Sequence, residues 1–302
     1  MSLITALFVA LALFGVYYVF VMSRGLRAAR AEGETVTPTP LGVGTGTVTN
    51  FFDTLGIGSF ATTTAIFRAT RHVRDEKIPG TLNVGHTLPT ITQAIVFTAL
   101  FRTAIDTGTL VEMIIAAVAG AWVGARVFGG WPRQRIQVGM GLALLTAVGI
   151  MLFRQLMGDP PGGDLTKLEG TRLIIGLVGN FVLGMLMTLG IGLYAPCMIL
   201  ISMLGMNITA AFPVMMGSCA FLMPVASGNF IKLKAADLRA SLGLLIGGIP
   251  GVLLAYYVVK SLPLDVLKWL VMAVVTYTAI TLLLSARRER MNGSKGAPMA
   301  AH

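Results

Sequence analysis

The chain has little charge and almost no cysteine. Only 12% of its 302 residues are charged, whereas soluble domains carry about 25%. Apolar residues make up 55% of the chain and the mean hydropathy is +0.80. Several apolar runs reach the roughly 18 residues that indicate a membrane span. This composition excludes a soluble protein and predicts an all-α polytopic membrane protein.

The two cysteines, Cys197 and Cys219, are too few for a disulfide framework, and their apolar surroundings favour buried thiols. The chain also lacks the Gly-rich loop of nucleotide hydrolases and the Cys/His spacing of zinc sites. It has no Ser, His and Asp that would lie at one depth in the membrane and could form a catalytic triad. We therefore expect no enzyme, no cofactor and no metal site. The net charge of +10 is spread over short Lys/Arg clusters between apolar segments, which is typical of cytoplasmic loops and not of nucleic-acid binding.

The pentapeptide Thr-Leu-Gly-Ile-Gly occurs twice, at Thr54–Gly58 and Thr188–Gly192, each time inside an apolar segment. Matched features follow each copy: Ala61 and Ala195, Gly85-His86 and Gly217-Ser218, the glycine pairs Gly120 with Gly124 and Gly247 with Gly251, and Pro132 and Pro263. Glycines four apart let helix backbones approach closely. The repeat predicts two related halves, each a glycine-broken segment followed by three transmembrane helices.

The predicted organisation has five parts. Residues 1–40 form an extra transmembrane helix and a cytoplasmic linker, and residues 41–156 form the first repeat. Residues 157–171 are an extracytoplasmic loop, residues 172–286 the second repeat and residues 287–302 a cytoplasmic tail. Residues 3–22 lack a cleavage site and are followed by arginines, which indicates a retained first helix.

The distribution of Lys and Arg distinguishes two possible topologies of the broken segments. If each crosses the membrane once, 14 Lys/Arg face one side and 9 the other. If each dips in and returns, the division is 17 against 6, which the positive-inside rule favours. Each half then has three full crossings, so the halves form an inverted repeat with re-entrant segments and a cytoplasmic C-terminus.

The broken segments predict a small-anion site. Non-helical backbone is tolerated at membrane depth only where it is buried in protein or lines a cavity. The half-helix after each break presents free N–H groups and a positive dipole end. The residues assigned to this site are Thr54, Gly56, Ile57, Gly58, Ser59, Thr62 and His86, and in the second copy Thr188, Gly190, Ile191, Gly192, Cys197 and Ser218.

Each of these assignments has a structural alternative. The glycines alone are common in membrane helices as packing residues, but their duplication favours a site. Asp53 is either a proton or coupling-ion site or a residue at the membrane surface. His86 either lines the pathway or bonds to backbone, and Cys197 either touches substrate or packs.

The chain resembles the TauE/SafE sulfite-exporter-like permeases, also called the toluene-sulfonate uptake permease family. The resemblance covers residues 42–286 and is best in the second half, where Gly190-Ile191-Gly192, Pro196, the stretch 205–211, Gly217-Ser218 and residues 247–251 carry it. The family's glycine triplet is reduced to Gly-Ile-Gly-Ser and Gly-Ile-Gly-Leu. The resemblance implies export of sulfite, an organosulfonate or another small sulfur-containing anion.

We therefore expect a secondary transporter of a small sulfur-containing anion in a bacterial inner membrane, working by alternating access. Its expected partners are that anion and membrane lipid, with a homodimer left open and no nucleic acid. Two alternatives remain at this point. One is a passive anion channel of the same fold, and the other a membrane protein that handles thiols or metals through its cysteines and methionines.

Overall fold

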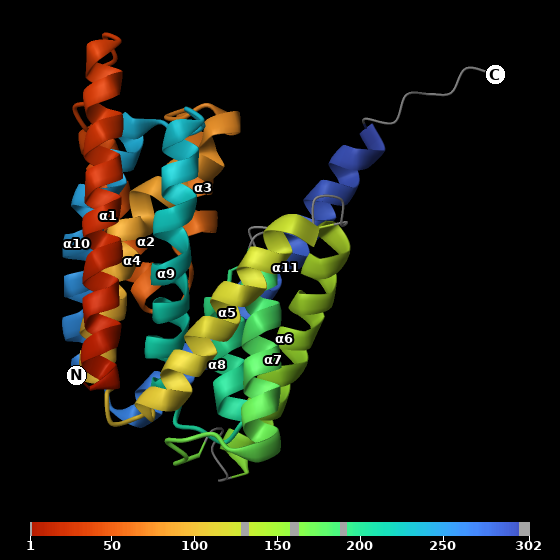
Figure 1. Ribbon diagram of the computed structural model, residues 1–302. Coiled ribbons are helices and arrows are strands. Elements are labelled where there is room, and N and C mark those ends of the chain that lie inside the picture. Colours follow the sequence, from red (N-terminus) through yellow and green to blue (C-terminus); the bar gives the residue numbers. More distant parts are fainter. Residues whose placement is uncertain (1, 128–132, 158–162, 188–191, 296–302) are drawn as a thin grey trace.

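The computed structural model describes residues 2–127, 133–157, 163–187 and 192–295. These residues form helices and no named strand. The α-helices are α1 (Leu3–Ala31), α2 (Pro40–Thr54), α3 (Ser59–Thr70), α4 (Ile78–Leu100), α5 (Thr107–Val127), α6 (Arg133–Leu156), α7 (Gly170–Met187), α8 (Tyr194–Met203), α9 (Ala211–Lys232), α10 (Leu238–Ser261) and α11 (Leu264–Lys295). Figure 1 shows them as one bundle.

Among the described residues, six helices are long and apolar enough to cross a membrane. They lie at Leu3–Ala31, Thr107–Gly124, Gly170–Met187, Ile208–Lys232, Leu238–Ser261 and Asp265–Arg288. The architecture is therefore that of a multi-pass helical membrane protein, as the composition predicts. The expected crossing over 81–101 forms α4, which does not meet the same hydropathy criterion because many of its buried residues are polar.

The first break separates α2 from α3. Gly56 and Gly58 have φ of +99° and +85°, a region that side chains with a Cβ rarely adopt. The Gly56 amide donates to the Asp53 carbonyl at 2.8 Å and closes α2, and the helix restarts at Ser59. The second break separates α7 from α8. Its Thr188, Gly190 and Ile191 lie outside the described residues.

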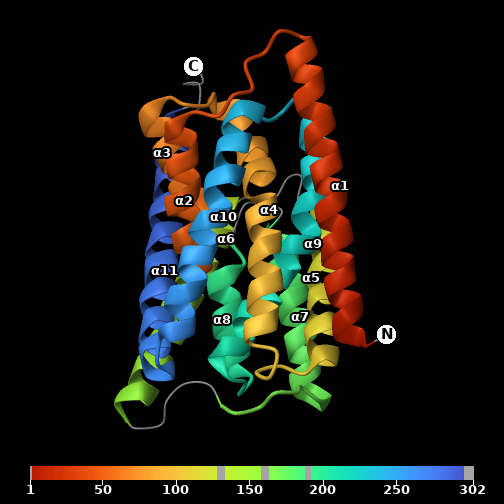
Figure 2. The ribbon, with the colours of Figure 1, turned by 90° about the vertical axis from the view of Figure 1, so that its left-hand side faces the viewer.

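Hydrogen bonds tie the loops into two groups, one at each end of the bundle. At one end, His72, which follows α3, bonds through Nε2 with Oγ1 of Thr39, the N-cap of α2, at 3.1 Å. At the other end, the Leu165 amide, before α7, donates to the Gly205 carbonyl, after α8, at 3.3 Å. Thus α3 returns to the end at which α2 begins, and α8 returns to the end at which α7 begins (Figure 2).

Exposed ion pairs lie in both groups of loops. A hydrogen bond that Lys234 donates to Glu32 raises the pKa of Lys234, and a hydrogen bond from Lys167 lowers the pKa of Glu169. Their nitrogen–oxygen distances are 2.7 and 2.8 Å. All four side chains are largely exposed, so these pairs contribute little to stability.

Two helix pairs meet backbone to backbone. On α10, a Cβ added at Gly247 would fall on the Val43 carbonyl of α2. On α5, a Cβ at Gly120 would fall on the Phe181 carbonyl of α7. The expectation that these glycines allow close helix approach is confirmed at both positions. We call the α2–α10 and α5–α7 contacts the glycine seams.

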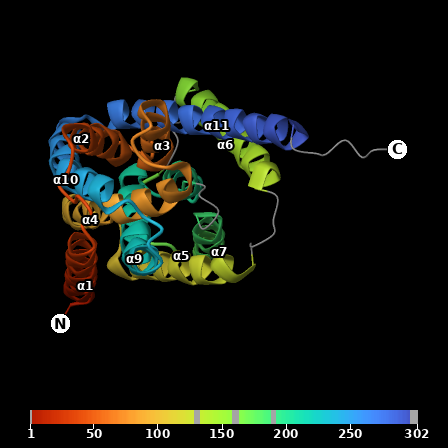
Figure 3. The ribbon, with the colours of Figure 1, turned by 90° about the horizontal axis from the view of Figure 1, so that it is seen from above.

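The other main pairs are α4 with α9 and α6 with α11. Thr87 Oγ1 and Ser227 Oγ hydrogen-bond across α4–α9 at 2.8 Å. Seen from above, α6 and α11 lie together at one edge of the bundle, and α1 lies at its periphery (Figure 3). The Tyr18 hydroxyl of α1 donates to the Val84 carbonyl of α4 at 2.6 Å, which anchors this extra helix.

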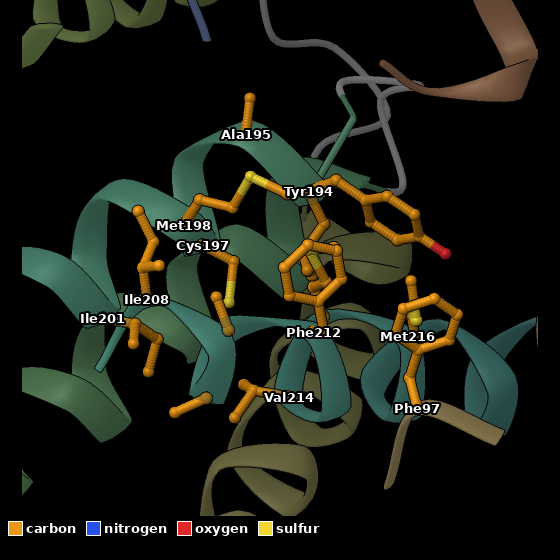
Figure 4. Close-up of a cluster of buried hydrophobic side chains, with 14 of the residues drawn as sticks. Phe97, Tyr194, Ala195, Cys197, Met198, Ile201, Ile208, Phe212, Val214 and Met216 are labelled. Carbon is orange, nitrogen blue, oxygen red and sulfur yellow. The ribbon is translucent and has the colours of Figure 1, made fainter. Parts of the chain in front are cut away.

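The helix α11 extends beyond the expected end of the second repeat at residue 286 and reaches Lys295. The physical reason is composition, since Ala286 to Arg290 consists of residues with high helix propensity. The short helix α8 is fixed by a core cluster with α9 and α4 that includes Met198, Phe212 and Phe97 (Figure 4). The rings of Phe97 and Phe212 stack at 5.5 Å between centroids.

Candidate functional site

Both breaks line one cavity of about 90 Å³. A buried water molecule occupies about 10–15 Å³ of such a cavity, so this one has room for several waters or one small ion. Its lining is Asp53, Gly56, Ile57, Gly58, Ser59, Phe60 and Thr90, then Met187, Gly192, Leu193, Tyr194, Ala195, Cys219, Met223 and Thr278. The lining comes from α2, α3, α4, α7, α8, α9 and α11, so the cavity lies where the two parts of the chain meet.

Direct contact also joins the first break to α8. A Cβ added at Gly56 would meet the terminal methyl of Met198, which follows the second break. A Cβ added at Gly192 would meet nothing within 4 Å, and neither would one at Gly58. Gly56 therefore allows close packing between the two broken segments, whereas Gly58 and Gly192 leave space in the cavity.

Asp53 is the charged side chain of this cavity. It is 5% exposed, and its carboxylate accepts hydrogen bonds from the Ser59 amide at 2.6 Å and from Gln93 Nε2 at 2.9 Å. None of the ion pairs in the described part of the chain includes Asp53, and none of the lining residues is Lys or Arg. An unpaired carboxylate inside a membrane protein is costly and marks a functional site by default.

Gln93 of α4 connects the two broken segments. Its Nε2 donates to Asp53 and, at 2.9 Å, to Thr54 Oγ1. Its Oε1 accepts the hydroxyl hydrogen of Tyr194 at 2.8 Å. The Tyr194 ring extends away from the core cluster around Met198 (Figure 4). The chain of bonds Asp53–Gln93–Tyr194 thus runs from the end of α2 to the start of α8.

Two helix N-termini flank the cavity. The helices α3 and α8 begin at Ser59 and Tyr194, and neither N-cap residue, Gly58 or Leu193, provides a side-chain cap. The first amides of a helix have no partner within it and carry the positive end of its dipole. At α3, Asp53 already occupies one of these amides, that of Ser59. A carboxylate of the protein therefore lies where an external anion would bind.

Sulfur atoms line another part of the cavity. Cys219 Sγ of α9 lies 3.7 Å from Met187 Sδ, the last residue of α7. Met223, one helical turn beyond Cys219, lines the same space.

The predicted site residues fall into three groups. Asp53, Gly56, Ile57, Gly58, Ser59 and Gly192 line the cavity. Thr54, Thr62, His86, Cys197 and Ser218 are not among its lining residues. Thr188, Gly190 and Ile191 lie outside the described residues.

The nearby polar residues have structural partners. His86 bonds to Asn50 at 3.0 Å and through Nε2 to Thr63 Oγ1 at 3.1 Å, so it joins α4 to α2 and α3. The Ser218 hydroxyl donates to the Val214 carbonyl of its own helix at 2.7 Å. Cys197 packs in the core cluster (Figure 4).

Gln93, Thr90, Tyr194 and Thr278 were not anticipated from the sequence. A signal existed for Gln93, because an amide inside the apolar run 81–101 is an uncommon polar residue at membrane depth. Tyr194 follows the second glycine motif by two residues, but a tyrosine there is also compatible with packing.

Comparisons with family models, with curated proteins and with solved structures gave no match to this chain.

Proposed function

We propose that the protein is a secondary transporter of a small anion, and that the cavity between the two breaks is its substrate site. The observation that carries the proposal is the joint lining of one cavity by the N-termini of α3 and α8. Helix N-termini bind anions through free amides and the dipole. Discontinuous helices whose N-termini point at an anionic substrate are a recurring design of secondary transporters.

The substrate class rests on the resemblance of residues 42–286 to the sulfite-exporter-like permeases. A small sulfur oxyanion such as sulfite, or an organosulfonate, is therefore the first candidate, and the proposed direction is export. The cavity has room for a compact anion, because its volume is about 90 Å³. The membrane potential favours loss of an anion from the cytoplasm by about 2.3 kcal/mol per charge at 100 mV.

The proposed topology is an inverted repeat of α2–α6 and α7–α11, with re-entrant pairs α2–α3 and α7–α8 that enter from opposite faces. The lengths of three of the four half-helices support it, since α2, α3 and α8 have 15, 12 and 10 residues, about 22, 18 and 15 Å, against about 30 Å for a membrane core. The fourth, α7, has 18 residues, about 27 Å, and is the longest of them. The packing supports it too, because exchanging the two parts converts the α2–α10 contact into α7–α5 and leaves α4–α9 and α6–α11 unchanged.

Asp53 is the proposed coupling residue. As a carboxylate it repels an anion in the same cavity, whereas protonation removes that charge and the competition for the Ser59 amide. Anion and proton then bind together, which makes transport proton-coupled. The other titratable groups that line the cavity are Tyr194 from α8 and Cys219 from α9.

Flux measurements on the full chain in proteoliposomes test this function. We expect sulfite efflux down its gradient, competition by small sulfonates and faster efflux when the inside of the vesicle is the more acidic side, because anion and proton leave together. The site variant is Gly192→Leu, because a Cβ added at Gly192 meets nothing within 4 Å, so a larger side chain has room to extend into the cavity. This variant should reduce flux to background.

The matched control is Gly44→Leu. Gly44 lies in α2 and also has nothing within 4 Å of an added Cβ, but it is exposed and outside the cavity lining. We expect wild-type flux from it. Full flux through Gly192→Leu, or no flux of any anion in a panel of sulfite, thiosulfate, sulfate, sulfonates and carboxylates, would reject the proposal.

A further inference from the structure

Two sulfur atoms meet at the cavity, where the Cys219 thiol donates a hydrogen bond to the Met187 thioether. Cys219 Sγ and Met187 Sδ come from different helices, α9 and α7, and lie 3.7 Å apart. Both line the cavity together with Met223. Two sulfur ligands held about 2.3 Å from one metal ion lie about 4 Å apart in trigonal geometry. The observed distance therefore needs only a small adjustment to accommodate a metal between them.

We propose that Cys219, Met187 and Met223 form a binding site for a soft monovalent cation, with Cu(I) as the representative ion. Thiolate and thioether ligands select Cu(I) over the hard cations, which prefer oxygen. The inference goes beyond anion transport and does not depend on it, although both use the same cavity.

The charges of the ligands and of the cavity lining favour Cu(I) at this site. Cu(I) displaces the Cys219 thiol proton, which leaves to the buffer, and forms a neutral pair with the thiolate. A neutral pair avoids the cost of burying a net charge in an apolar cavity. Met187 and Met223 add ligands without adding charge. Asp53 also lines the cavity, so an approaching cation meets a negative side chain and no Lys or Arg among the lining residues.

The test is a competition experiment on the purified full-length protein under reducing conditions. Cu(I) is added as its complex with a chromophoric chelator, and its transfer to the protein is measured. We expect one ion per chain, and X-ray absorption at the copper edge should show a shell of sulfur neighbours. Cys219→Ser should weaken binding by at least about tenfold, which is about 1.4 kcal/mol.

Met187→Leu and Met223→Leu keep the side-chain volume, so they test the site without relying on a variant that fails to fold. Each should weaken Cu(I) binding while the protein elutes as the wild type does. The control is Cys197→Ser, since Cys197 is an equally buried thiol in the core and not in the cavity lining. Equal Cu(I) affinity of Cys219→Ser and wild type, or a copper shell without sulfur, would overturn the proposal. The readout is metal binding, so a failure of the anion flux assay has no bearing on it.

Discussion

Three hydrogen-bonded side chains, Asp53, Gln93 and Tyr194, join the end of α2 to the start of α8 beside the cavity. Gln93 uses both ends of its amide, one toward Asp53 and one toward Tyr194, at 2.9 and 2.8 Å. If Asp53 takes up a proton, it no longer needs both donors, and the amide of Gln93 is free to reorient. The Tyr194 hydroxyl then loses its acceptor. A change of charge at the end of α2 is in this way transmitted to the start of α8.

The first prediction concerns Asp53→Asn. In the wild type, anion binding should tighten as pH falls, by about tenfold per unit while Asp53 is ionised, because only the protonated form removes the like charge. Asparagine mimics that form permanently, so the variant should bind anion equally at all pH values and lose proton-driven flux. The measurement is the affinity for a small sulfonate, whose charge does not change with pH in this range, by calorimetry from about pH 5 to 8, the range in which physiological proton switches operate.

Asp106→Asn is the control for this experiment. Its carboxylate accepts from the Thr109 amide at 3.0 Å in a loop outside the cavity lining, and asparagine caps helices equally well. A pH dependence that survives in Asp53→Asn would remove Asp53 from the coupling mechanism.

The second prediction compares two buried tyrosines. Tyr194→Phe leaves Gln93 Oε1 without its donor, and Tyr18→Phe does the same to the Val84 carbonyl. Each should lower the free energy of unfolding by about 1–2 kcal/mol, the cost of an unsatisfied buried acceptor. Thermal unfolding in detergent should show similar losses, but only Tyr194→Phe should change the pH dependence of flux. Identical flux profiles for the two variants would mean that the Gln93–Tyr194 bond is only structural.

Sequence reasoning located part of this site. The duplicated glycine motif predicted a site near Asp53, Gly58 and Gly192, and all three line the cavity. It also assigned His86 and Cys197, which are buried elsewhere because their partners come from other helices. The spacing of residues along one segment cannot tell which side of a helix another helix will cover. Gln93 and Thr278 were missed for the same reason.

At the scale of the helices, the glycine seams fix the positions of the helices that flank the two broken segments. They hold α10 against α2 and α5 against α7 at backbone contact, so each broken segment packs tightly against one long helix. The sequence predicted the glycine pairs and the helices that carry them. It did not predict the partner helices, because a glycine in a helix indicates that another backbone packs closely against it but does not identify the helix that supplies that backbone.

The third prediction tests a seam. Gly247→Ala places a methyl group on the Val43 carbonyl, which belongs to backbone and cannot rotate away, and should destabilise the protein by about 1–3 kcal/mol. Gly44→Ala, on the partner helix α2, meets nothing within 4 Å and should stabilise by up to about 1 kcal/mol through helix propensity. The midpoints of thermal unfolding of the two variants should move in opposite directions. Equal midpoints would mean that the α2–α10 contact is not as close as described.

At the scale of the molecule, the seams also limit which bodies can move. Each seam joins a helix of α2–α6 to a helix of α7–α11, so the two parts of the sequence are interlocked. Rocking one part against the other would separate backbones in contact. Any movement of one group of helices against another is therefore expected to keep α2 with α10 and α5 with α7.

The fourth prediction concerns the orientation of the loops. Single cysteines replacing Glu76 and Lys234 should react with an impermeant thiol reagent from the same face of the membrane, and one replacing Lys167 from the opposite face. All three side chains are more than half exposed, at 67%, 71% and 59%. Cells and inverted vesicles provide the two faces. Labelling of positions 76 and 234 from opposite faces would exclude the re-entrant topology.

Charge counting alone predicts the topology that is proposed here, because Lys and Arg cluster in loops whose side of the membrane they determine. The location of the cavity needed the structure, since it depends on how seven helices meet.

The glycine seams also affect how the protein is made. The helix α2 leaves the ribosome early, but α10, its seam partner, follows only after α3 to α9 have been translated. At about 5–20 residues per second, that delay is roughly 10–40 s. During this time the bare glycine face of α2 lies in the bilayer without its partner, available to lipid, to a neighbouring chain or to an insertion chaperone. The nascent chain must therefore be held in an incomplete state until synthesis is almost finished.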